Sequence, residues 1–167
     1  MSQAVAWRDR LISFRTLAFI ILGLGVVRLV VAFLMPQEPS IMAPDEGTYA
    51  ALAGVVGSGG DWVGWNYAWG ASLYPGSRAL LGPAALLTYV GLPDLTAVRV
   101  ISVLYAVGAQ LVLLAIARLA RHRLAPAGPA GLPLVSWPML GVAVFVLMPS
   151  NVLWSTLGLR EAACAFW

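Results

Sequence analysis

The chain has 167 residues, of which 60% are hydrophobic and 10% are charged, and its mean hydropathy is +0.86. Soluble domains carry roughly a quarter charged residues, so this composition excludes the soluble globular class and predicts an integral membrane protein. The formal net charge of +3 would suit a nucleic-acid binder. The arginines, however, lie mostly at the ends of apolar runs, where they set membrane topology, so we expect no nucleic-acid partner.

The first predicted span runs from about residue 16 to residue 35, after a short basic stretch over residues 1–15. A bilayer core of about 30 Å needs about 20 apolar residues, so this run is long enough for one crossing, and Pro36 ends it. A cleaved signal peptide is the alternative. Arg28 interrupts the apolar run and no small-x-small cleavage site follows it, which favours a retained span.

Residues 36–94 are too polar to cross the membrane and form the predicted outward loop. Within this loop, Pro44 and Asp45 are start signals for a short helix, which the glycines from Gly57 onward end. The apolar run 79–92 is too short for a full crossing, so we expect an interfacial or re-entrant helix there.

Three further spans are predicted over residues 95–119, 134–148 and 152–167 onward. An arginine cluster over residues 118–123 ends the second span, and basic loops face the cytoplasm. The pattern predicts an all-α, polytopic integral membrane protein of about four transmembrane helices, with short interfacial helices in the first outward loop. We expect it in the plasma (inner) membrane with a cytoplasmic N-terminus.

Two adjacent carboxylates, Asp45 and Glu46, begin the short helix of the outward loop. Carboxylates at such a place can act as a general base or as metal ligands. The alternative is a structural role, because acidic residues in the first turn of a helix interact favourably with its dipole.

Arg28 lies within the first span, where a guanidinium is costly unless it faces a cavity, a carboxylate or a phosphate. A structural ion pair and a substrate-phosphate contact both remain open for it. Arg99 lies near the outer end of the second span, and Arg160 and Glu161 lie inside the fourth helix. Three guanidiniums from Arg28, Arg99 and Arg160 that converge in the outer half of the bilayer would bind a lipid phosphate or diphosphate. Alternatively, the Arg160–Glu161 pair neutralises itself against neighbouring helices.

The order of these features resembles the N-terminal part of the GT-C superfamily glycosyltransferases, which include protein O-mannosyltransferases and aminoarabinose transferases. The ordered motifs are Pro44-Asp45-Glu46-Gly47-Thr48-Tyr49, the segments 97–102 and 149–155, and Leu159-Arg160-Glu161. The resemblance covers nearly the whole chain. It implies transfer of a sugar from a polyprenyl-phosphate donor to a glycan or protein acceptor on the extracytoplasmic face of the membrane.

By motif position, the resemblance implies that Asp45 is the acidic catalytic residue, with Glu46 as its neighbour. Tyr49 of the same motif is a candidate substrate-binding residue, together with the three arginines and Glu161. A divalent cation is a candidate for neutralising the leaving phosphate, although no cluster assigns a metal site.

Members of this superfamily have more spans, so we expect the chain to be the N-terminal part of a longer enzyme and inactive by itself. The alternatives are a non-enzymatic scaffold subunit of an envelope assembly complex and a transporter or flippase fragment. The paired broken helices typical of many transporters are not evident in the sequence.

Overall fold

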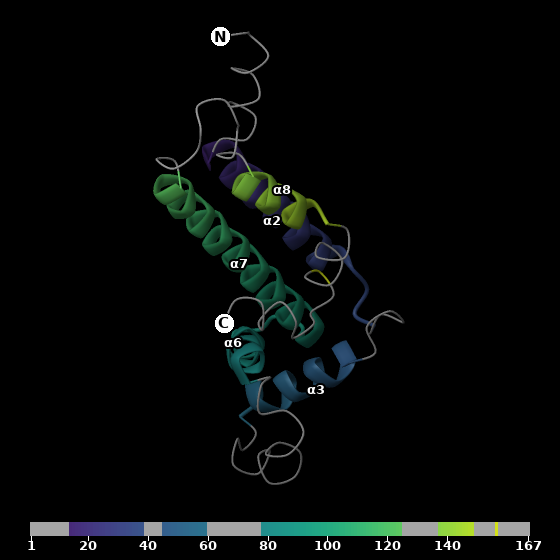
Figure 1. The fold of residues 1–167 in the computed structure, drawn as a ribbon. Coiled ribbons are helices and arrows are strands. Elements are labelled where there is room, and N and C mark those ends of the chain that lie inside the picture. The colour runs from purple at the N-terminus through teal and green to yellow at the C-terminus, as the bar shows by residue number, and fades with distance from the viewer. Residues whose placement is uncertain (1–13, 39–44, 60–77, 125–136, 149–155, 157–167) are drawn as a thin grey trace.

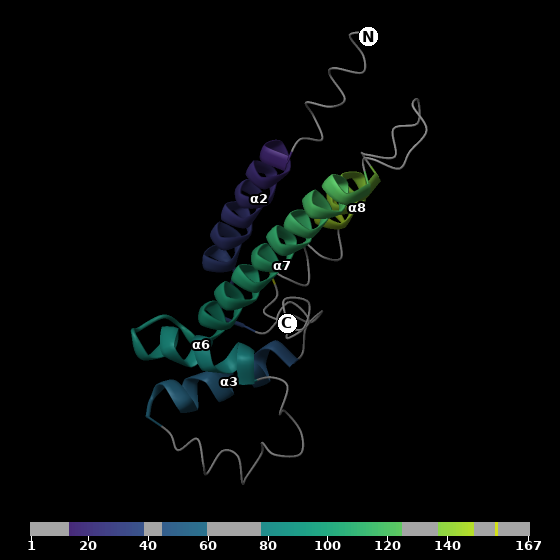
Figure 2. The same ribbon diagram turned by 60° about the vertical axis from the view of Figure 1, so that its left-hand side comes forward.

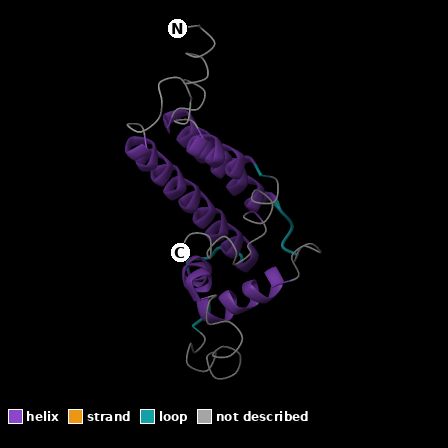
Figure 3. Cartoon of the chain, viewed as in Figure 1, coloured by secondary structure: helices purple, strands orange, loops and turns teal. Residues whose placement is uncertain are grey.

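The computed structural model describes residues 14–38, 45–59, 78–124 and 137–148, together with residue 156. These residues form helices and no strand (Figure 3), so the all-α prediction is confirmed for the described part of the chain. The helices are α2 (Phe14–Leu34), α3 (Asp45–Gly57), α6 (Arg78–Tyr89), α7 (Asp94–Leu124) and α8 (Trp137–Leu147).

Two helices are long and apolar enough to cross a membrane, and both were predicted as spans. They are α2, with a mean hydropathy of 2.7, and the Asp94–Ala120 part of α7, with 2.3. The 21 residues of α2 extend about 31 Å at a rise of 1.5 Å per residue, which matches the bilayer core.

The prediction of four spans is not confirmed. Helix α8 accounts for 11 residues of the predicted third span. Residues 134–136 of that span lie outside the described residues, so the third span stays a prediction. The predicted fourth span lies outside the described residues, apart from Thr156.

Helices α2 and α7 lie side by side and run in opposite directions (Figures 1 and 2). Helix α8 lies beside them at the end where α2 begins. Buried apolar side chains from all three helices form one core cluster there: Leu17, Ile21, Leu114, Ala117, Val142 and Val146. Many apolar side chains on the outer sides of α2 and α7 are exposed, as a bilayer-facing surface requires.

Helices α3 and α6 pack together across the opposite end of the α2–α7 pair (Figure 2). The bounds of α3 agree with the predicted start at Asp45 and end at Gly57, and α6 confirms the short helix predicted over 79–92. A Cβ atom at Gly57 would lie 2.8 Å from the carbonyl oxygen of Ala85 and 2.8 Å from Cβ of Thr88. A glycine is therefore needed where α3 crosses α6.

The two ends of the α2–α7 pair carry opposite charges. At one end, the guanidinium of Arg118 on α7 lies 4.8 Å from the ring centre of Phe14, the first residue of α2. The other end carries the carboxylates of Glu38, Asp45 and Asp94. Folding thus gathers charges that are scattered along the sequence into a basic and an acidic end.

Candidate functional site

Glu46 and Arg99 form a buried ion pair that joins α3 to α7. Arg99 Nε donates to Glu46 Oε1 at 2.6 Å and Arg99 Nη2 donates to Oε2 at 3.1 Å, so the contact is bidentate. Both side chains have 0% exposure. A fork-shaped guanidinium on a carboxylate is among the strongest and most directional hydrogen-bonded pairs in proteins.

The same guanidinium also binds the chain that leaves α2. Nη1 of Arg99 donates to the carbonyl oxygen of Pro36 at 2.9 Å, and Nη2 donates to that of Glu38 at 3.3 Å. One side chain therefore ties together the end of α2, the first turn of α3 and the first turns of α7. A donor phosphate, the partner predicted for Arg99, would have to compete with Glu46 and these two carbonyls.

Asp45 and Glu46 are adjacent in sequence but have different surroundings. Glu46 is fully buried, whereas Asp45, the first residue of α3, is exposed. The reason is helical geometry: with 3.6 residues per turn, neighbouring side chains point about 100° apart. When Glu46 faces Arg99, Asp45 must face away from the core. Of the two predicted catalytic carboxylates, Asp45 is therefore the one that an external substrate can reach.

Tyr49 lies one turn after Asp45 and is 2% exposed. It belongs to the apolar cluster between α3, α6 and α7, which also contains Leu80, Leu81 and Val98. Its substrate-binding role stays a prediction. In this arrangement, its side chain contributes to the packing that holds α3 in place.

Arg28 is buried within α2, at 2% exposure, and makes one weak hydrogen bond to the described part of the chain. Its Nη2 donates to the carbonyl oxygen of Val146 at 3.5 Å, in the last turn of α8. Helix C-termini carry partial negative charge and unpaired carbonyls, so a guanidinium is favourable there. Nε and Nη1 of Arg28 have no hydrogen-bond partner among the described residues.

Arg28, Arg99 and Arg160 were expected to converge, but the two of them that the structure describes have separate partners. Arg99 binds Glu46, while Arg28 contacts α8 and has no carboxylate within salt-bridge distance in the described part of the chain. The structural ion pair considered for Arg28 therefore lacks a described partner. Arg160 and Glu161 lie outside the described residues.

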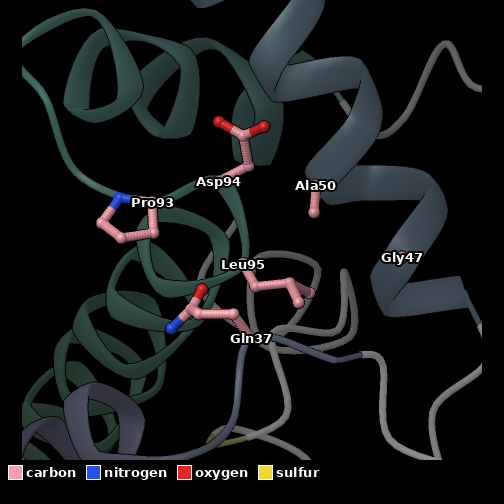
Figure 4. A pocket seen from close by; sticks show the side chains of 6 residues that line it. All are labelled: Gln37, Gly47, Ala50, Pro93, Asp94 and Leu95. Atoms are coloured by element: carbon pink, nitrogen blue, oxygen red, sulfur yellow. The ribbon is translucent and has the colours of Figure 1, made fainter.

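A pocket of about 340 Å³ opens where α3 passes the start of α7 (Figure 4). We refer to it as the α3–α7 pocket. Asp94 and Gln37 are the polar side chains of its lining; the other lining residues are Gly47, Ala50, Pro93 and Leu95. Nε2 of Gln37 donates to Oγ1 of Thr96 at 2.8 Å.

Sequence reasoning did not select Asp94 or Gln37 as candidate site residues. Asp94 has one local signal, an acidic residue after a proline at a helix start, which ordinarily indicates helix initiation, and Gln37 has none. What distinguishes Asp94 is a long-range contact: its carboxylate lies against α3 at Gly54, where a Cβ atom would collide with Oδ2. That contact depends on how α3 crosses α7.

Among the described residues, no three His, Cys, Asp or Glu side chains come together as a metal-binding group, so no metal ligands are assigned. A scan against family models and searches of curated proteins and of solved structures return no match for this chain.

Proposed function

We propose that this chain forms the N-terminal part of a membrane glycosyltransferase that moves a sugar from a polyprenyl-phosphate donor to an acceptor on the extracytoplasmic face. The observation that supports the proposal best is that the neighbouring carboxylates of Asp45 and Glu46 differ in burial. Glu46 is buried against Arg99 and holds α3 in place, while Asp45 is exposed at the acidic end of the α2–α7 pair. Asp45 thus has a fixed backbone position and a free approach from outside.

In this proposal, α2 and α7 cross the inner membrane as part of a multi-pass protein. The arginine-bearing end with Arg15 and Arg118 faces the cytoplasm, in accord with the positive-inside rule. Helices α3 and α6 then lie at the outer surface of the bilayer. A polyprenyl-linked donor would present its sugar at this surface, where Asp45 is exposed.

Asp45 acts as the general base. Its carboxylate accepts the proton of the acceptor hydroxyl while that oxygen bonds to the anomeric carbon of the donor sugar. The bond between the anomeric carbon and the phosphate oxygen breaks, and the lipid phosphate leaves with the electron pair. The configuration at the anomeric carbon inverts. This transfer step balances and needs no further reactant, because the proton goes to Asp45 and the electron pair leaves with the lipid phosphate.

The phosphate contact is assigned to Arg28 in preference to Arg99. Four hydrogen bonds already occupy the Arg99 guanidinium. Arg28 keeps two nitrogen atoms, Nε and Nη1, without a partner among the described residues. A buried guanidinium with unpaired donors is a costly arrangement, and an anionic group would relieve that cost.

The test is Asp45→Asn in the protein as its gene encodes it, with transfer measured from a radiolabelled polyprenyl-phosphate sugar. Loss of a general base should lower turnover by about 100-fold or more. The matched control is Glu38→Gln, which alters another exposed carboxylate at the same end and should retain activity. Wild-type turnover by the Asp45 variant would remove this residue from the mechanism.

A transporter or flippase is the second candidate, and one observation favours it. Helix α8 ends at Leu147 beside the buried Arg28, and broken helices next to charged groups form the binding sites of many transporters. Substrate flux into vesicles without sugar release from a lipid carrier would support this candidate over the transferase. A non-enzymatic scaffold would instead tolerate neutral replacement of both Asp45 and Arg28.

A further inference from the structure

We propose that the α3–α7 pocket binds an uncharged, hydroxyl-rich ring, the sugar unit of the substrate, and not the phosphate. This inference rests on the proposed function, because it assigns one part of that substrate to a place in the structure. None of the candidate site residues selected from the sequence lines the pocket, although Gly47 of its lining belongs to the motif 44–49.

The size of the pocket suits such a ring. Its volume of about 340 Å³ is at the lower end of the range of small-molecule sites, roughly 300–1,000 Å³. The space exists because α3 presents small residues on this side. Gly47 and Ala50 are three positions apart, so they lie on one face of the helix.

The polar groups of the pocket are separated by apolar ones. Figure 4 shows Asp94 and Gln37 at two ends of the lining, with Leu95 between them and Ala50 facing from α3; the Asp94 carboxylate points away from Gln37 and lies against α3 at Gly54. Because Nε2 of Gln37 is engaged with Thr96, its amide oxygen is the group left to accept a hydrogen bond. Gln37 therefore offers an acceptor at one end and the half-buried Asp94 forms the other end, and the apolar stretch between them matches the C–H face of a sugar ring.

The charge of the pocket disfavours a phosphate. Among the described residues that line the pocket, Asp94 carries the one charged side chain. Arg99, one turn further along α7, is bound to Glu46 and cannot offset that charge without breaking the ion pair. A hydroxyl donating to Asp94 is favourable, whereas a phosphate oxygen next to it would be repelled.

The position of Asp94 is set by α3. Its carboxylate lies so close to Gly54 that no Cβ atom would fit there, which restricts the rotation of the Asp94 side chain. The acceptor oxygens are thus held before a ligand arrives, and a preorganised group loses less entropy on binding.

Direct binding to the purified, membrane-reconstituted protein tests the inference. The probes are methyl glycosides of neutral hexoses and pentoses, with inorganic phosphate as the charged comparison, and saturation-transfer NMR reports contact. Ala50→Leu fills the pocket and should abolish the glycoside signal. The matched control is Ala51→Leu, on the exposed side of α3, which should leave the signal unchanged. Asp94→Asn retains the shape of the side chain and should weaken glycoside binding about tenfold or more.

The outcomes separate this inference from the proposed function. Ala50 also belongs to the buried cluster between α3, α6 and α7, so the helical content of Ala50→Leu is compared with that of the wild type. Glycoside binding that is lost in folded Ala50→Leu and weakened in Asp94→Asn supports the pocket even if no transfer activity is found, in which case only the proposed function fails. Equal binding by wild type, Ala50→Leu and Asp94→Asn overturns the pocket, even if transfer proceeds. Absence of any glycoside signal from folded protein, or tighter binding of phosphate in competition with the glycosides, overturns it as well.

Discussion

Removing one partner of the buried Glu46–Arg99 pair should strongly destabilise this fold. Glu46→Gln removes the negative charge but keeps the size of the side chain. Among the described residues, it leaves the Arg99 guanidinium, at 0% exposure, with two neutral carbonyl oxygens and the amide introduced at position 46 as its acceptors. Breaking a buried pair by removing one charge typically costs about 3–5 kcal/mol, because the other charge stays buried without compensation. We therefore expect Glu46→Gln to lower the free energy of unfolding by about 3–5 kcal/mol.

A double-mutant cycle isolates the pair. Arg99→Met should cost about as much as Glu46→Gln, since it leaves a buried carboxylate without its cation. The double variant buries no charge, so its loss should be smaller than the sum of the single losses by at least about 2 kcal/mol. The free energy of unfolding can be measured by circular dichroism in mixed micelles with increasing SDS, because helical content reports the native state of this all-helical structure.

Glu38→Gln is the matched control. The carbonyl of Glu38 accepts from Arg99, but its side chain is exposed, so the variant should change stability by no more than about 0.5 kcal/mol. The reasoning is refuted if Glu46→Gln is as stable as this control, or if the losses of the two single variants are additive in the double variant.

Two further predictions concern helix packing and orientation. Gly57→Ala should lower the free energy of unfolding by about 1–3 kcal/mol, because the added Cβ would meet Ala85 and Thr88 of α6. The control is Gly23→Ala, which should not destabilise the protein because nothing lies within 4 Å of the added Cβ. Equal effects of the two variants on SDS unfolding would contradict the close crossing of α3 and α6. In a cysteine-free background, Ser58→Cys should react with a membrane-impermeant maleimide added outside intact cells, and Ala120→Cys should react only after permeabilisation. The reverse pattern would place α3 in the cytoplasm and remove the basis of the proposed transfer.

Local signals predicted several elements closely. Helix α3 begins at Asp45 and ends at Gly57 because both bounds depend on nearby residues: an acidic first turn after a proline, and a glycine at the end. The two span-forming helices follow from the length of apolar runs, which is also a local property. The third predicted span, over residues 134–148, is described only from Trp137 onward, where α8 is helical to Leu147, so its full length stays a prediction.

The candidate site was predictable only in part. The sequence identified Asp45, Glu46, Arg28 and Arg99 as unusual charges, but it did not determine which of them pair. Glu46 and Arg99 are 53 positions apart, and whether they meet depends on the place where α3 crosses α7. The prediction that the arginines converge on one phosphate assumed that all of them face a common cavity.

Composition and periodicity alone therefore determined that the described part of this protein is helical and which segments are apolar enough to cross a membrane. Tertiary structure decided that Glu46 is structural and Asp45 exposed, that Arg28 faces the end of α8, and that Asp94 and Gln37 line a pocket. The physical reason is the range of the interactions. Helix formation and hydropathy act over a few neighbouring residues, whereas ion pairs and pockets form between segments that only the packing of α3 on α7 brings into contact.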